Sequence, residues 1–164
     1  DTEGVVMVPA LLGLGTPQWD FGARGALFGL TRGTTRAHIV RAVLEGVAHS
    51  GADLLEATER DTGLRVESLR VDGGMSANRL FVQALADACD RPVEVSPELE
   101  ATTLGAGYLA GLASGMWSGT EQIAAAWSPR EVIGPSGRDP GRDRWRRAVE
   151  RAGEWYPDLS GIRF

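Results

Sequence analysis

Lysine is absent from this chain: all 17 basic residues are arginine. A Walker A loop uses a Gly-Lys-Ser/Thr run to reach the terminal phosphates of a nucleotide, so this segment contains no such loop. Schiff-base chemistry, which needs a lysine amine, is excluded as well. A nucleotide site in this segment therefore has to work without a lysine.

Cysteine is almost absent too. Cys89 is the single cysteine and cannot form a disulfide within the chain. It follows Leu85, Ala86 and Ala88 in a predicted helix, where a thiol commonly packs as a small apolar side chain. We interpret Cys89 as a packing residue and expect a reduced, cytoplasmic setting.

Long hydrophobic runs are missing. The longest weakly polar stretch, Leu104–Met116, contains four glycines and is too short to cross a bilayer. No signal-peptide pattern is present. We therefore expect no membrane partner.

Negative charge outnumbers positive charge, with 22 acidic residues against 17 basic ones, so the net charge is −5. This balance disfavours a nucleic-acid partner. The arginines near the end of the chain alternate with aspartate and apolar residues and predict the solvated face of an amphipathic helix; they are Arg142, Arg144, Arg146 and Arg147. His38 and His49 lie three helical turns apart, too far to bind one ion from a single helix, so we expect no metal site in this segment.

Hydrophobic periodicity predicts alternating strands and helices. A long amphipathic helix begins at Thr34 or Thr35 and ends near Gly63, because apolar residues recur three and four positions apart. Strands are predicted at 4–10, 25–30, 66–71 and 92–95, helices at about 77–90 and from Thr102 or Thr103 to 114, and a connector at 128–144. This order predicts an α/β fold whose sheet has parallel members.

The run Val71–Asn78 joins a predicted strand to a predicted helix through a turn almost without side chains. Gly73 and Gly74 let the backbone approach a ligand closely, and the following helix presents unpaired N–H groups to an anion. Asp-Gly-Gly is also ordinary turn chemistry. Taken alone, the run favours a plain turn.

Several separated motifs carry a resemblance to a known family. In chain order they are 8–20, 23–33, 38–48, 72–74 and 104–113. Together they resemble the C-terminal domain of the FGGY carbohydrate kinases, from Val8 to about Trp117, with a further likeness at Trp145–Ala152.

The resemblance implies an actin-like, ribonuclease H-like ATPase fold. It also implies that the chain is an incomplete C-terminal half of a two-domain sugar kinase, because the substrate pocket, the catalytic base and the first phosphate loop belong to the family's N-terminal half. On this basis residues 1–164 form a partial C-terminal domain, with a core at about 4–127, a linker at about 128–140 and a C-terminal helix at about 141–155. The segment alone is predicted to be inactive.

The resemblance also implies where a nucleotide binds. It places Gly74 against the phosphates of ATP and Asn78 on the adenine side, with Gly73 and Met75 flanking them. Mg²⁺ is the implied second cofactor. Asp72 either holds a magnesium-bound water or ends the strand, and we favour the second. Valine at position 74 is expected to block the phosphates and to strain a positive φ angle.

Glycines inside the predicted helix at 102–114 are unusual, because each costs about 1 kcal/mol relative to alanine. We interpret Gly105 and Gly107 as marking tight packing of this helix against the sheet, next to the site.

The implied acceptor is a small polyol or sugar. Trp19-Asp20 and Leu30–Gly33 are similar to the family members that phosphorylate glycerol, whereas Gln18 and Phe21-Gly22 depart from them, and xylulose and gluconate kinases share much of the rest. A non-catalytic actin-like interaction or regulatory module is the alternative of another class. A homo-oligomer is left open. A dinucleotide-binding oxidoreductase is disfavoured, because Gly13-Leu14-Gly15 lacks the third glycine.

Overall fold

The computed structural model describes residues 1–161. In chain order its elements are β1 (Val6–Val8), β2 (Ala26–Phe28), α1 (Arg36–Thr62), β3 (Leu69–Val71), the 3₁₀ helix η1 (Gly74–Ala77), α2 (Arg79–Cys89), β4 (Val93–Val95), α3 (Ala101–Ala113), α4 (Thr120–Ala126), β5 (Glu131–Ile133), α5 (Arg142–Ala152) and α6 (Pro157–Ser160). The α/β prediction is confirmed.

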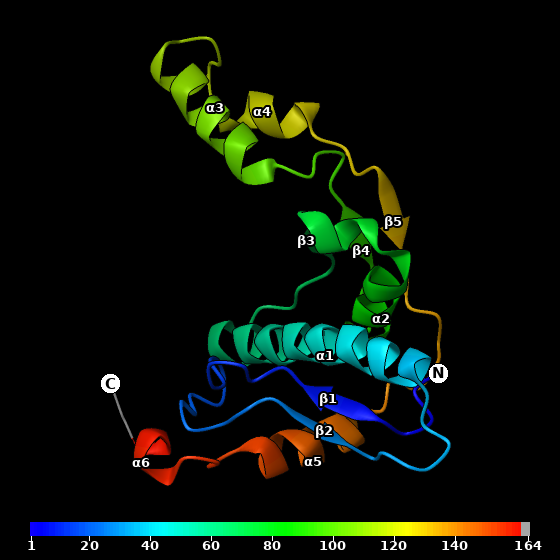
Figure 1. Cartoon of the computed structure of the whole chain (residues 1–164). Coiled ribbons are helices and arrows are strands. Elements are labelled where there is room, and N and C mark those ends of the chain that lie inside the picture. The colour runs from blue at the N-terminus through cyan, green and yellow to red at the C-terminus, as the bar shows by residue number, and fades with distance from the viewer. Residues whose placement is uncertain (162–164) are drawn as a thin grey trace.

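The long helix α1 crosses the middle of the molecule. β1, β2 and α5 lie on one side of it, and α2 lies on the other side with the sheet formed by β3, β4 and β5 (Figure 1). It begins after Thr35, whose N–H donates to His38 Nδ1 at 3.2 Å, and it ends where Gly63 adopts a left-handed φ of 68°. Both ends agree with the prediction. On the β1 side, Gly46 allows so close an approach that a Cβ there would collide with the Met7 carbonyl oxygen.

Two hydrophobic cores lie on opposite sides of α1. The larger joins α1 to α2, β4 and β5 through residues that include Ala52, Leu85, Cys89, Val93 and Ile133. The smaller joins β1 to α5 through residues that include Val8, Trp145, Ala148, Val149 and Ala152. Burial raises the pKa of the Cys89 thiol to about 11, so it is protonated near neutral pH, in agreement with a packing role.

The sheet on the α2 side of α1 has the strand order β3-β4-β5, with β3 and β4 parallel and β4 and β5 antiparallel. β5 lies inside residues 128–140, where the sequence predicts a linker, so the linker prediction is wrong at 131–133. The chain after β5 is also anchored, because Ser136 N–H donates to Asp87 Oδ1 on α2 at 2.6 Å. A strand of three residues between proline and glycine is too short to show an alternating pattern.

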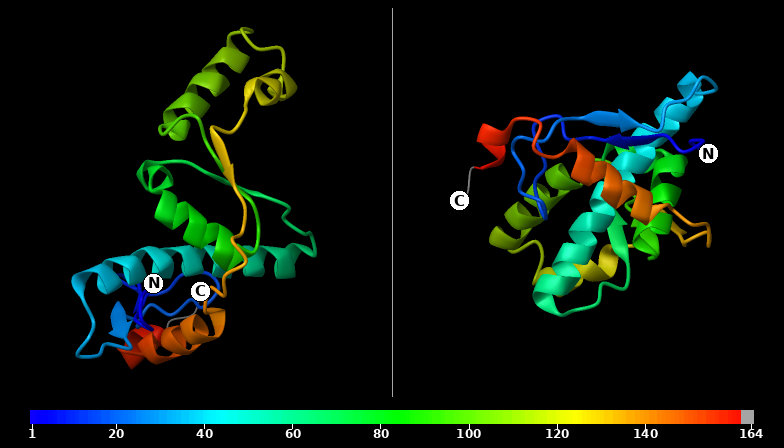
Figure 2. Two further views of the ribbon diagram at one scale, coloured as in Figure 1. Left: turned by 90° about the vertical axis from the view of Figure 1, so that its right-hand side faces the viewer. Right: turned by 90° about the horizontal axis from the view of Figure 1, so that it is seen from below.

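Helices α3 and α4 form a hairpin that projects away from the rest of the molecule (Figures 1 and 2). A Cβ added at Gly105 or Gly107 would meet no heavy atom within 4 Å, so the predicted packing of these glycines against the sheet is wrong. Gly111 is the one buried residue of α3, and Trp117 covers it. α3 carries no charged residue, yet neither it nor any other helix within residues 1–161 has the length and apolar character needed to span a membrane.

Candidate functional site

The glycine-rich turn lies between β3 and α2, and most of it is exposed. Gly73 has a φ of +81°, a left-handed conformation that favours glycine, and η1 follows it directly. The residues predicted to contact a nucleotide are thereby brought together on one connection; they are Gly73, Gly74, Met75 and Asn78.

Hydrogen bonds within the turn fix its shape. Ser76, only 3% exposed, donates to the Gly73 carbonyl oxygen through its side chain at 2.7 Å and through its N–H at 3.1 Å. Asn78 N–H donates to the Met75 carbonyl oxygen at 2.9 Å. The sequence reasoning missed Ser76; a serine three residues after a glycine at a turn was the available signal.

Gly74 differs from the expectation in one respect. The positive φ belongs to Gly73, so a side chain at Gly74 would not strain a left-handed backbone. A Cβ at Gly74 would also meet no heavy atom within 4 Å. Space for an incoming ligand is therefore present beside Gly74.

Asn78 caps helix α2. Its Oδ1 accepts from Leu80 N–H at 3.0 Å and from Phe81 N–H at 3.3 Å. The capping role weighed against adenine contact is thus formed on the oxygen side of the amide. Its Nδ2 makes no hydrogen bond within residues 1–161, so this atom remains able to donate to a ligand.

The chemistry of the turn suits binding. Asp72 is its one ionisable side chain, and Met75 adds an apolar surface that is 41% exposed. Arg79, which follows, is paired with Glu131 of β5 at 2.9 Å. The turn therefore offers backbone N–H groups and an amide, without a general base and an acid placed as a pair.

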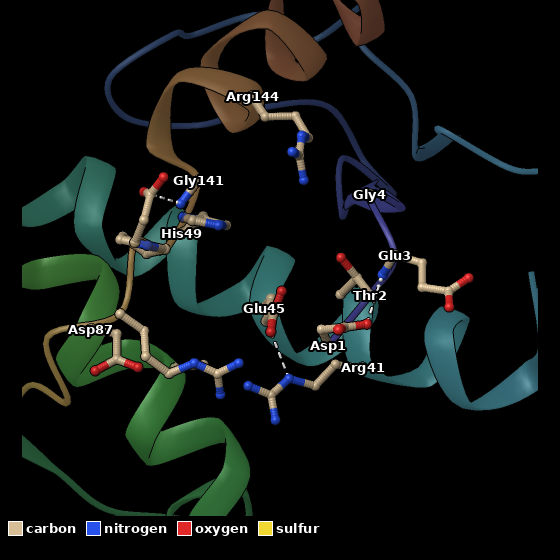
Figure 3. Close-up of a pocket in the computed structure, with 14 residues that line it drawn as sticks. Asp1, Thr2, Glu3, Gly4, Arg41, Glu45, His49, Asp87, Gly141 and Arg144 are labelled. Carbon is tan, nitrogen blue, oxygen red and sulfur yellow. Dashed lines mark hydrogen bonds and ion pairs between the residues drawn. The ribbon is translucent and has the colours of Figure 1, made fainter.

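Two of the pockets in the described chain lie away from the turn. One, of about 330 Å³, is lined by side chains that include Arg41 and Glu45 of α1, Asp87 of α2 and Arg144 of α5; Figure 3 shows Arg144 extending from α5 into the space beside α1. The other, of about 970 Å³, is lined in part by Trp19. Neither includes residues of the turn, and within residues 1–161 no cluster of metal-ligating side chains is found.

Arg142 departs from the predicted solvated face. Its guanidinium group is largely buried and donates to Asp53 Oδ1 and to Glu56 Oε1, both on α1. Asp53 also accepts from Trp145 Nε1 at 2.8 Å, and the Trp145 ring stacks on His49 at 5.2 Å between ring centroids. These contacts fasten α5 to α1, whereas Arg144, Arg146 and Arg147 are exposed as predicted.

Asp20, in the Trp19-Asp20 motif, holds the loop after β1 to the C-terminal segment. Its carboxylate accepts from the N–H groups of Gly22 and Glu154 at 2.8 Å each and from Ser160 Oγ. Burial raises the pKa of Asp20, but the hydrogen bonds from Ser160 and from backbone N–H groups outweigh it and lower the pKa. Asp20 therefore has a structural role in this chain.

Fold and turn together define the class: an α/β domain that presents a glycine-rich strand-to-helix turn. The chain belongs to the FGGY family of carbohydrate kinases, because the model of that family's C-terminal domain matches residues 1–114. The family resemblance drawn from the sequence is confirmed.

Glycerol kinases are among the most similar curated relatives. That of Aromatoleum aromaticum is 52% identical over 159 residues, which cover 94% of this chain and 32% of the relative. That of Deinococcus radiodurans is 48% identical over 161 residues, which cover 96% of this chain and 32% of the relative. The chain thus spans about a third of the length of these proteins.

Solved structures give the same family. Plasmodium falciparum glycerol kinase with ADP aligns with a TM-score of 0.80 and 35% identity over 100% of this chain and 32% of its own. Xylulose kinase from Rhodospirillum rubrum aligns with a TM-score of 0.72 and 27% identity over 92% of this chain and 30% of its own. The predicted fold, part of the C-terminal half of a sugar kinase, agrees with these matches.

Proposed function

We propose that this chain is the nucleotide-binding part of an ATP-dependent glycerol kinase. The full-length parent then transfers the γ-phosphate of ATP to a hydroxyl of glycerol and releases ADP and glycerol 3-phosphate. The observation that carries the proposal is the 52% identity to a glycerol kinase across 94% of this chain.

The glycine-rich turn is the proposed nucleotide contact. Gly73 and Gly74 meet the phosphates through backbone N–H groups, and Asn78 Nδ2 and Met75 lie toward the base. The support is geometric: the space beside Gly74 is open, and Asn78 Nδ2 has no partner within residues 1–161. Mg²⁺, which neutralises charge on transferring phosphates, would be held outside this segment.

Catalysis is assigned to the rest of the parent. Phosphoryl transfer depends on positioning and charge stabilisation, so half of a cleft can bind a nucleotide without acting on it. The polyol contacts and the catalytic base then come from the part of the parent beyond this chain. We place the parent in the cytoplasm, where ATP and small polyols are available.

The test is ADP release by the full-length parent with glycerol, xylulose, ribulose, gluconate and erythritol as acceptors. Saturable turnover with glycerol alone is the expected result. Turnover with xylulose or gluconate instead would show that glycerol is the wrong acceptor and that the parent is still a carbohydrate kinase. These acceptors are included because a xylulose kinase aligns with a TM-score of 0.72. ATP binding without turnover of any of the five acceptors would favour the non-catalytic module.

A further inference from the structure

The buried hydroxyl of Ser76 sits beneath the glycine-rich turn and makes one hydrogen bond in the described chain. Ser76 Oγ donates to the Gly73 carbonyl oxygen at 2.7 Å, and the Ser76 N–H donates to the same oxygen at 3.1 Å. Because only 3% of Ser76 is exposed, the Gly73 carbonyl oxygen accepts both hydrogen bonds from the buried side of the turn.

The direction of this bond determines the direction of another group. The Gly73 C=O and the Gly74 N–H belong to one peptide unit, and in a trans peptide these two groups point in opposite directions. Because the carbonyl oxygen points inward to Ser76, the Gly74 N–H points outward. No acceptor for that N–H exists within residues 1–161, and the space beside Gly74 is open.

A peptide between two glycines rotates more easily than any other, because neither residue has a Cβ to restrict it. If the unit flipped, the carbonyl oxygen would face the ligand and repel a phosphate. The side chain of Ser76 doubles the hydrogen bonding that opposes this flip.

We propose that Ser76 is a positioning residue for nucleotide phosphates: its hydroxyl holds the Gly73–Gly74 peptide with the Gly74 N–H toward the ligand. The inference rests on the proposed nucleotide site and adds to it a residue that touches no nucleotide atom itself.

The experiment compares Ser76→Ala with its parent by calorimetric titration of ADP and of adenosine into the full-length protein. ADP affinity is expected to fall about fivefold, the change that corresponds to losing about 1 kcal/mol from one hydrogen bond. Adenosine affinity should be unchanged, because it has no phosphate. In turnover, KM for ATP should rise with kcat retained, and Ser76→Thr, which keeps the hydroxyl, should restore ADP affinity.

Ser50→Ala is the matched control, since Ser50 Oγ donates to the Gly46 carbonyl oxygen at 3.1 Å on α1. It should leave ADP affinity unchanged. Equal loss of ADP and adenosine affinity in Ser76→Ala, or a lower melting temperature with ADP affinity retained, would overturn the positioning role. If Gly74→Val also binds ADP normally, the proposed nucleotide site at the turn is wrong. This variant therefore distinguishes a wrong site from a wrong role of Ser76 at a correct site.

Discussion

At the scale of single residues, the two adjacent glycines of the turn differ in backbone conformation. Gly73 needs its left-handed φ, whereas Gly74 has an ordinary backbone and open space beside it. A substitution at Gly74 therefore changes what can approach the turn and leaves the contacts beneath it intact.

Gly74→Val in the full-length parent is predicted to weaken ATP and ADP binding at least tenfold, because a branched side chain occupies the space of the phosphates. The melting temperature should stay within about 2 °C, as for surface substitutions that break no contact. Titration calorimetry and thermal unfolding measure both quantities. Gly134→Val is the matched control, since Gly134 is also open and has no positive φ. Unchanged ADP affinity in Gly74→Val would make the turn purely structural.

His49 provides a second prediction at this scale. Burial, aided by the charge of Arg142 and opposed by Asp53, lowers the pKa of His49 from 6.5 to about 4. The unfolded chain therefore binds this proton more readily, and the stabilisation present above pH 6.5 is lost as the pH falls toward 4. Between pH 7 and pH 4.5, His49 alone should remove about 2 kcal/mol from the free energy of unfolding.

The measurement is urea unfolding at pH 7 and at pH 4.5. His49→Phe keeps a ring against Trp145 and cannot titrate, so its loss of stability should be smaller by about 2 kcal/mol. Carboxylates titrate in both proteins and cancel in this comparison. An equal loss in the variant and the parent would show that His49 does not carry the effect.

At the scale of elements, the helices of this chain differ widely in how much they bury. α1 and α2 share a core, whereas α3 projects with its hairpin partner α4 and buries one residue. Leu109 of α3 is 70% exposed. Since interior glycines weaken a helix and little tertiary contact supports this one, the stability of the two regions should differ widely.

Hydrogen exchange should reveal this difference in the isolated chain. Amide protons of α3 are predicted to exchange at least a hundredfold faster than those in the middle of α1, because local opening of the hairpin exposes little buried surface. Peptide-resolved mass spectrometry at pH 7 measures both regions in one sample, and α2 is the internal control for a short, well-packed helix. Similar protection of α1 and α3 would contradict the prediction.

At the scale of the whole molecule, the proposed function separates nucleotide binding, in this chain, from catalysis, in the rest of the parent. It spans 32% of the length of the glycerol kinases it matches, and the turn supplies no acid-base pair. The proposed function therefore predicts that residues 1–164 release no ADP from ATP and glycerol, because a bound nucleotide would lack a positioned acceptor. A coupled assay at high protein concentration tests this. Robust turnover by the isolated chain would overturn the division of labour.

Much of the fold could be predicted because its signals are local. The length of α1 follows from apolar spacing, with Thr35 at its start and Gly63 at its end, and the strand-turn-helix at Gly73 follows from a change of period. β5 could not be predicted, since three residues carry no period and its pairing with β4 is set by contacts more than 30 residues apart. Small residues in α3 were misread because glycine content alone does not reveal whether a neighbour is present.

The candidate site could likewise be predicted from the sequence only in part. Its residue types and their order were readable from the sequence through family motifs, whereas the hydrogen bond from buried Ser76 to Gly73 depends on which atoms become buried.

The sequence by itself determined the family, the α/β class and the place of the glycine-rich turn, because these depend on residue order, periodicity and backbone freedom. Only the tertiary structure decided that the positive φ lies at Gly73, that Arg142 is held by Asp53 across two helices, and that α3 stands apart from the sheet. The last two features depend on distances between residues remote in the chain, which exist only after the elements have packed. The first depends on the path of the backbone within the turn, where Ser76 bonds to Gly73.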